Sequence, residues 1–150
     1  MISVGFTGTR EGFTAVQTEY FRTILAGLAL ANREGNFPHG DCQGADAQAH
    51  DLVRDLCPDW KIHIHPGPEG DPHRAHRKGD FYYPPKTHFA RNRDIVHASQ
   101  LVVGVSVAPQ RLERGGTWYT LDYAIKSKVA TKVLWPAGGV EDLYVRGSES

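Results

Sequence analysis

The segment Arg114-Gly115-Gly116-Thr117 has the residue types of a phosphate-binding turn. It separates an apolar run, residues 101–107, from an amphipathic segment at 117–128. Glycine lets the backbone approach a ligand closely, and the first N–H groups of a following helix carry a partial positive charge. Such a junction suits a phosphate group. Gly-Gly-Thr also occurs in ordinary turns, so the rest of the chain has to decide between a binding site and a plain turn.

A second glycine junction, Thr7-Gly8-Thr9-Arg10, follows the first apolar stretch of the chain. The backbone N–H groups, the Thr9 hydroxyl and the Arg10 guanidinium are all groups that bind oxyanions, the guanidinium in a bidentate manner. The alternative is a surface turn with a solvated arginine. The segment matches neither the Gly-x-Gly-x-x-Gly dinucleotide fingerprint nor the P-loop, which ends in Gly-Lys-Ser/Thr.

A third junction contains Gly40 and Gly44 and leads into an expected helix. Asp46 falls in the first turn of that helix, where a carboxylate caps free N–H groups and interacts favourably with the helix dipole. The functional alternative is that Asp46 accepts a hydrogen bond from a ribose hydroxyl. The sequence leaves both open.

A polar pair, Arg91-Asn92, lies in a further predicted helix. Asn92 shares a helix face with Phe89 and Val96, and this face should point inward. A buried amide needs hydrogen-bond partners, and a ligand could supply one. Arg91 and its neighbour Arg93 are candidates for a phosphate contact, with solvated side chains as the alternative.

For catalysis the sequence offers two carboxylates, Asp46 and Asp122, although Asp122 also fits a simple charge on a helix surface. There is no Gly-x-Ser-x-Gly elbow and no convincing Cys–His pair. The histidines match no known zinc spacing, so we expect no metal and no bound cofactor. The basic stretch 73–78 is interpreted as a cationic cover over an anionic ligand, or as a solvated loop.

The apolar pattern predicts alternating strands and helices that position these groups, which is typical of an α/β domain with a mostly parallel sheet. In such sheets the ligand crevice lies beyond the carboxyl ends of the strands, so the three glycine junctions should meet at one edge. The connection 66–85 is long and typical of a lid or binding loop. Strands are expected at 2–6, from 37, at 61–65, 101–107 and 133–135. Helices are expected at 14–32, from 45, at 86–98 and 117–128, with 1–136 as the domain and 137–150 as a tail.

Composition limits the classes of partner. A chain of 150 residues most simply forms one domain. Its 17 Lys and Arg equal its 17 Asp and Glu, which argues against broad nucleic-acid binding but leaves a local basic pocket possible. The first residues do not resemble a signal peptide, and no apolar run approaches the roughly 20 residues of a membrane span. With only two cysteines, we expect a cytoplasmic protein with reduced thiols that does not insert into membranes.

The ordered set of motifs resembles the SLOG superfamily, the Rossmann-like group that joins the DNA-processing (Smf) proteins and the "Lonely Guy" phosphoribohydrolases. The similarity covers roughly residues 2–136 and is strongest to small stand-alone bacterial and phage members. It implies a three-layer Rossmann-like fold and a nucleotide or nucleotide-derived ligand, such as ADP-ribose. It also implies a homo-oligomer, a dimer or larger. The motifs that carry the resemblance are Thr7-Gly8-Thr9-Arg10, His39 to Asp46, Ala49-His50, Arg91-Asn92 and Gly115-Gly116-Thr117.

One position departs from the phosphoribohydrolase branch, whose motif is similar to Pro-Gly-Gly-x-Gly-Thr-x-x-Glu with a catalytic glutamate. Here Thr120 stands at the glutamate position. Asp122 comes two residues later, about 200° further around the helix. Hydrolysis by that mechanism is therefore in doubt, whereas binding is not.

The sequence accordingly predicts a protein that binds a nucleotide-type small molecule as a sensor, carrier or sequestering protein. The alternative is a hydrolase that cleaves the N-glycosidic bond of a nucleotide, with Asp46 or Asp122 as the acting carboxylate. Single-stranded DNA binding is less favoured because the charge is balanced. The expected ligand-binding residues are Gly8, Thr9, Arg10, Gly40, Gly44, Asp46, Arg91, Asn92, Gly115, Gly116 and Thr117.

Overall fold

A single seven-stranded sheet forms the centre of the molecule, in the order β4-β3-β2-β1-β5-β6-β7. The structure is a computed structural model and describes residues 1–147. Every strand pair is parallel except β6 with β7. The strands are β1 (Ile2–Gly8), β2 (Gly35–His39), β3 (Lys61–Ile64), β4 (Phe81–Tyr82), β5 (Leu101–Val105), β6 (Ala130–Leu134) and β7 (Val140–Tyr144).

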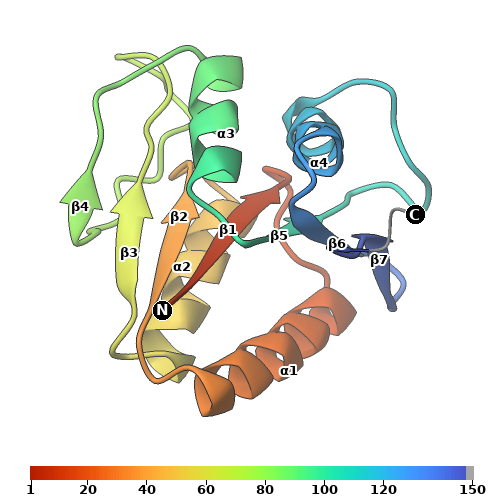
Figure 1. The fold of residues 1–150 in the computed structure, drawn as a ribbon. Coiled ribbons are helices and arrows are strands. Elements are labelled where there is room, and N and C mark those ends of the chain that lie inside the picture. The colour runs from red at the N-terminus through yellow and green to blue at the C-terminus, as the bar shows by residue number, and fades with distance from the viewer. Residues whose placement is uncertain (148–150) are drawn as a thin grey trace.

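Four helices cover the two faces of this sheet (Figure 1). The apolar residues of α1 (Ala15–Ala31) and α2 (Ala45–Leu56) pack in one core cluster with β1, β2 and β3. Residues of α3 (His88–His97) and α4 (Gly116–Lys126) form a second cluster with β5 and β6. Helices, sheet and helices make three layers, which confirms the predicted three-layer α/β Rossmann-like fold with a mostly parallel sheet.

Local sequence signals account for several of these elements. Thr14 and Gln17 form a reciprocal capping box at the start of α1, as the spacing Thr-x-x-Gln predicts. The Gln17 amide is buried and donates to the carbonyl oxygens of Ser106 (2.8 Å) and Leu134 (3.0 Å). The start of α1 is thereby tied to the carboxyl ends of β5 and β6. All of β5 is buried, which agrees with its continuous apolar sequence.

Two strands were not predicted. The expected tail at 137–150 is wrong for Val140–Tyr144, because this segment forms β7 and pairs antiparallel with β6. Gly138 and Gly139, both with positive φ, make the tight connection, a glycine pair typical of hairpin turns. The long connection likewise contains β4, whose two residues pair with β3. Residues 148–150 of the expected tail lie outside the described residues.

The order in which the chain adds strands reverses at β1, which is the topological switch point of the sheet. From β1 the chain proceeds outward to β2, β3 and β4, and then returns to place β5 on the other side of β1. The β1–β2 ladder joins only Ile2 with Gly35 and Ser3 with Asn36, whereas β1 pairs with β5 from Val4 to Gly8. The carboxyl halves of β1 and β2 are therefore not paired with each other. Among residues 1–147 no helix combines the length and apolarity needed to cross a bilayer.

Candidate functional site

A cavity of about 630 Å³ lies at the carboxyl ends of β1, β2 and β5. This is the edge where ligands bind in open α/β sheets, and the volume lies within the range of small-molecule pockets. The loop after β1, the turn after β2, the first turns of α3 and the junction before α4 contribute its lining. Among the predicted residues, those that line it are Gly8, Thr9, Arg10, Gly40, Asp46, Arg91, Asn92, Gly115, Gly116 and Thr117.

Gly44 is the expected ligand-binding residue that does not line the cavity. It precedes α2 with φ +87°, and a Cβ there would stand 2.3 Å from the carbonyl oxygen of Arg10. The next N–H, from Ala45, donates to the Thr9 carbonyl oxygen at 3.0 Å. Gly44 is thus required for the loop after β1 to lie against the start of α2, and it positions that loop without itself facing the cavity.

Asp122, one of the two candidate catalytic carboxylates, also lies outside the lining. It forms an ion pair with both Nη atoms of Arg111 on the outer side of α4. Thr120, at the position of the family glutamate, is fully buried, and its hydroxyl donates to the Gly116 carbonyl oxygen at 2.8 Å. The geometry therefore brings neither position to the cavity, and Asp46 is the candidate carboxylate that reaches it.

The junction before α4 presents backbone N–H groups to the cavity. Gly115 is the N-cap with φ +105°, a conformation that favours glycine, and no side chain caps the first turn. A Cβ at Gly116 would meet only the Asn92 amide, 3.8 Å away. An open, uncapped helix start of this kind has unsatisfied N–H groups with a partial positive charge, which can bind an anion if one enters the cavity.

The loop after β1 contributes a second, more restrained group. The Thr9 hydroxyl donates to the Glu11 carboxylate, so it is already engaged. Arg10 and Arg114 are exposed at the cavity, and neither guanidinium has a hydrogen-bond or ion-pair partner among residues 1–147. These two side chains are consequently free to neutralise a bound anion.

Asp46 is a buried carboxylate that the protein satisfies only in part. Its Oδ2 accepts the N–H of Cys42 at 3.1 Å, while Oδ1 is buried and has no hydrogen-bond partner in the described chain. Burial raises the pKa of Asp46 to about 6, and the nearby Arg91 charge opposes this shift. The carboxyl group is thus held in an environment that favours its neutral form, with one oxygen still able to accept a hydrogen bond.

Arg91 provides a fixed positive charge in the lining. Its Nη1 donates to the carbonyl oxygens of Gly40 (2.8 Å) and His65 (3.2 Å), and its Nη2 lies 3.0 Å from His88 Nδ1. Its Nε is buried and unpartnered, and no carboxylate forms an ion pair with the guanidinium within residues 1–147. The alternative of a solvated side chain is wrong for Arg91, which is buried, while Arg93 donates to the Tyr119 hydroxyl at 2.8 Å.

Cys42 and Phe89 line the cavity although the sequence analysis gave neither a role there. Burial raises the pKa of the Cys42 thiol to about 12, so the thiol is protonated and a poor nucleophile. Phe89, expected to face inward with Asn92 and Val96, is 53% exposed, whereas those two are buried. Helical periodicity alone does not show which residues in the first turn of α3 face the core and which lie at the rim of the cavity.

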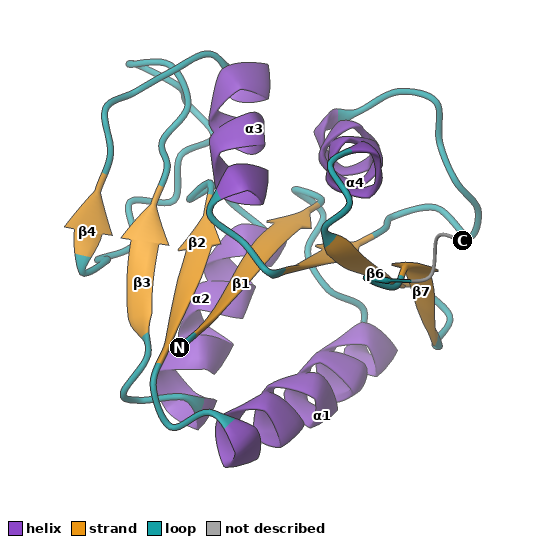
Figure 2. Cartoon of the chain, viewed as in Figure 1, coloured by secondary structure: helices purple, strands orange, loops and turns teal. Residues whose placement is uncertain are grey.

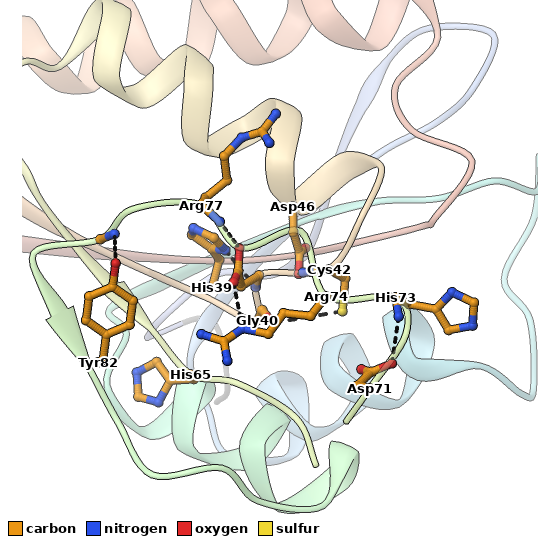
Figure 3. A network of polar contacts seen from close by, with 12 residues as sticks. His39, Gly40, Cys42, Asp46, His65, Asp71, His73, Arg74, Arg77 and Tyr82 are labelled. Atoms are coloured by element: carbon orange, nitrogen blue, oxygen red, sulfur yellow. Dashed lines mark hydrogen bonds and ion pairs between the residues drawn. The ribbon is translucent and has the colours of Figure 1, made fainter. Parts of the chain in front are cut away.

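The long connection is anchored to the turn after β2 through Asp41. Figure 3 shows Arg74 and Arg77 of this connection close to His39 and Gly40. The Asp41 carboxylate is fully buried and accepts from Arg74 Nε and from the Arg77 N–H, both at 3.0 Å. The backbone carbonyl oxygen of Asp41 accepts the Ala75 N–H at 2.8 Å. Arg77 also forms an ion pair with Asp51. The expected cationic cover is therefore largely committed to carboxylates of the protein, and only Asp71 and His73 of this connection reach the lining.

Two buried histidines support this turn. His39 Nδ1 accepts the Asp41 N–H at 2.9 Å, so His39 Nε2 carries the proton and donates to His50 Nδ1 at 2.9 Å. Burial lowers the pKa of His39 well below its ordinary value, which keeps it neutral. Asp41 has φ +56°, uncommon for a residue with a side chain. The histidine pair thus helps hold Asp41 in the conformation that anchors the loop.

Two further histidines, His63 and His65, contact the Tyr83 side chain. His65 stacks on Tyr83 with ring centroids 4.2 Å apart, and burial lowers its pKa to about 4. His63 lies 2.8 Å from both the Tyr83 hydroxyl and Asn36 Oδ1. Within the described chain, His, Cys, Asp and Glu side chains form no group of three or more suited to a metal ion.

Fold and cavity together define the class: a Rossmann-like α/β protein with a crevice at its switch point. Among solved structures, the chain is similar to the molybdenum cofactor binding protein from the phototrophic bacterium Rippkaea orientalis, with a TM-score of 0.64 and 16% identity over 89% of this chain and 76% of that one. It is also similar to TM1055, a Northeast Structural Genomics Consortium target, with a TM-score of 0.57 and 16% identity over 87% and 72% of the two chains. No protein-family model and no curated protein sequence matches it. At this identity, the similarities show the shared fold alone.

Proposed function

We propose that this protein binds a nucleotide or a nucleotide-derived molecule, such as an ADP-ribose-like signal, and acts as a sensor, carrier or sequestering protein. The observation that carries the proposal is the composition of the cavity. The uncapped, glycine-initiated start of α4 lies there together with Arg91, a buried guanidinium that has no carboxylate partner in the described chain. The lining also contains the carboxylates Glu11, Asp46 and Asp71, so the preference for a phosphorylated ligand rests on the free N–H groups and on guanidinium groups without an ion-pair partner in the described chain, and not on net charge.

The phosphate and the ribose of the proposed ligand each have a matching group. Phosphate oxygens are assigned to the N–H groups of Gly115–Thr117, with a second contact at the Gly8–Thr9 backbone. Arg10 and Arg91 are the charge partners, and the exposed Arg114 adds a third cation at the rim. The unpartnered Oδ1 of Asp46 is the acceptor for a ribose hydroxyl.

The comparisons support a small-molecule ligand on this scaffold. One structural neighbour is described as a molybdenum cofactor binding protein, which is consistent with a crevice that holds a small molecule. Membership of the SLOG superfamily and assembly as a homo-oligomer are part of the same proposal. They rest on the resemblance of the glycine and arginine motifs, which converge on the cavity.

A hydrolase that cleaves the N-glycosidic bond of a nucleotide is the second candidate, and one observation favours it. Asp46, whose pKa is raised to about 6 by burial, lines the cavity. A carboxyl group with a pKa near neutrality suits general acid–base catalysis. Asp122 is the weaker of the two proposed catalytic carboxylates, because its exposed ion pair with Arg111 lies away from the lining.

Ligand-induced stabilisation tests the binding proposal. The melting temperature is measured with AMP, ADP-ribose, NAD, cyclic nucleotides and oligonucleotides, since a ligand at 100 times its Kd adds about 2.7 kcal/mol to the free energy of unfolding. At least one mononucleotide or dinucleotide should raise the melting temperature, and oligonucleotides should have a smaller effect. If no nucleotide raises it, the proposal fails.

Two glycine-to-alanine variants then locate the site. Gly116→Ala adds a methyl group beside the Asn92 amide at the start of α4, with no contact closer than 3.8 Å. Gly27→Ala adds the same methyl group within α1, where nothing lies within 4 Å. Both should preserve or slightly raise the stability of the free protein. Only Gly116→Ala should lose the ligand-induced shift, because its methyl group occupies the phosphate position.

Mass spectrometry of the recovered nucleotide separates binding from turnover. An unchanged nucleotide supports the sensor, carrier or sequestering role. Release of free base by the wild type, abolished in Asp46→Asn and retained in Asp122→Asn, identifies a hydrolase that uses Asp46.

A further inference from the structure

We infer that Phe89 is the stacking surface for an aromatic base, so that the cavity takes a ligand with a nucleobase at one end and phosphate at the other. This inference rests on the proposed function and deepens it, because it distinguishes a nucleotide from a phosphorylated sugar. It assigns a position in the cavity to the part of the ligand that the glycine and arginine motifs leave unassigned.

The side chain of Phe89 is open at the cavity and supported behind. It is 53% exposed and belongs to the cavity lining. Its ring stacks on Tyr119 with centroids 4.2 Å apart and an interplanar angle of 28°. Arg93 holds Tyr119 in place through a 2.8 Å hydrogen bond to its hydroxyl. A ring with one face backed and the rest exposed can accept a second planar group without rearrangement.

Phe89 lies close enough to the proposed phosphate-binding N–H groups of α4 for a single nucleotide to contact both. The Tyr119 N–H donates to the Gly115 carbonyl oxygen at 3.0 Å, so Tyr119 lies one helical turn from the start of α4. Asn92 follows Phe89 by three residues on α3, and its amide lies beside Gly116. The Phe89 ring and the Asn92 amide therefore both lie close to the first turn of α4, whose N–H groups are the proposed phosphate site. A nucleotide likewise carries its base and its 5′-phosphate on a single pentose.

A core-packing role does not account for Phe89. Other members of its helix, Arg91, Asn92, Ile95 and Val96, are buried, while the Phe89 ring remains on the rim of the cavity. Stacking on an aromatic ring contributes about 1–3 kcal/mol per base and tolerates any base. The inference thus predicts affinity for an aromatic base, and it leaves the choice of base to other groups.

The test compares Phe89→Leu with Phe81→Leu. Phe81 is the matched control because it is 50% exposed and also stacked, on His63 at 4.7 Å, but it lies on β4 outside the cavity lining. Calorimetry measures the Kd of AMP and of ribose 5-phosphate for the wild type and both variants. The fluorescence of etheno-AMP provides a direct readout, since an ethenoadenine ring is quenched when it stacks on an aromatic side chain.

Phe89→Leu should weaken AMP binding about tenfold, which corresponds to about 1.4 kcal/mol, and should abolish the quenching of etheno-AMP. Ribose 5-phosphate should bind the wild type and Phe89→Leu equally, and Phe81→Leu should match the wild type with both ligands. If AMP binds the wild type and Phe89→Leu equally well, the stacking role is wrong while the nucleotide-binding proposal stands. If ribose 5-phosphate binds the wild type as tightly as AMP does, the inference also fails. Absence of any nucleotide binding overturns both.

Discussion

The cavity has two walls that hold their loops in opposite ways. The β2 wall, residues 39–46 with the connection 66–80, is held by a fully buried carboxylate, Asp41, which binds Arg74 and the Arg77 N–H. The β5 wall, residues 106–118, is mostly exposed and runs as a wide arc away from the sheet (Figure 2). Its one carboxylate clamp, Asp122 with Arg111, lies on the surface. Both walls use an aspartate to hold a loop arginine, and burial is the difference.

This difference is the opposite of the loop mobility that length and composition suggest. The connection 66–85 is long and rich in proline, glycine and charge, which is typical of a mobile lid. The backbone of this connection is nevertheless hydrogen-bonded to Asp41. At its far end, Asp80 and the Lys78 carbonyl oxygen bind Arg54 of α2. The shorter loop before α4 has fewer such bonds. We therefore expect the β5 wall to move when ligand enters and the β2 wall to stay in place.

Removing the buried anchor should have the largest effect. Asp41→Ala leaves the Arg77 N–H and the Arg74 guanidinium without their acceptor and places alanine at φ +56°. We expect the free energy of unfolding to fall by about 3 kcal/mol or more, measured by urea denaturation. Hydrogen exchange should then show residues 72–78 unprotected. A loss below about 1 kcal/mol would mean that burial does not distinguish the two walls.

Asp46→Asn should act in the opposite direction, by about 2 kcal/mol. Because burial raises the pKa of Asp46 to about 6, the folded protein binds the proton more tightly than the unfolded chain. The stabilisation from this group is complete below about pH 4 and is lost as the pH rises to 6. The variant should thus be more stable than the wild type at pH 7.5 and equal to it at pH 4, by urea denaturation at both values. It should also bind nucleotide more weakly. Equal stability at pH 7.5 would contradict the buried-charge account of this wall.

Ligand binding should protect the two walls unequally. Hydrogen exchange with and without AMP should slow about tenfold, or about 1.4 kcal/mol, in peptides covering residues 106–118. Peptides covering 66–80 should change little, because several of their N–H groups, including those of Ala75 and Arg77, are already hydrogen-bonded in the free protein. Protection confined to the β2 wall would show that the long connection is the moving part after all.

The smallest effect is expected at the exposed clamp. Asp122→Ala removes an ion pair whose side chains are 56% and 36% exposed, so stability should change by less than about 0.5 kcal/mol. Nucleotide affinity should not change, since Asp122 is outside the cavity lining. Denaturation curves and AMP titrations are measured for Asp122→Ala and Asp41→Ala under the same conditions. They compare the loss of one exposed carboxylate with the loss of one buried carboxylate.

The sequence was sufficient for the parts that depend on local pattern. Apolar periodicity located the major strands and all four helices, and glycine positions located the cavity edge. The sequence did not reveal side-chain contacts between residues that are far apart in the chain. Nothing near Asp41 in the sequence indicates that Arg74 would bind it, and helical spacing placed Phe89 in the core. The two missed strands, β4 and β7, are short or exposed, so they lack the apolar run that identifies a buried strand.

The short ladder between β1 and β2 has a mechanical consequence. Backbone hydrogen bonds join these strands only near Ile2 and Ser3, and Pro38 has no N–H with which to extend the ladder. The sheet therefore consists of two parts, β4-β3-β2 and β1-β5-β6-β7, which are hydrogen-bonded to each other at the amino ends of β1 and β2, while the cavity lies at the carboxyl ends. A small rotation about this seam would change the width of the cavity without breaking a β1–β2 hydrogen bond. The Phe6 and Phe37 rings, with centroids 6.0 Å apart, pack across this seam and oppose such a rotation, so the aromatic core also contributes to the stiffness of the crevice.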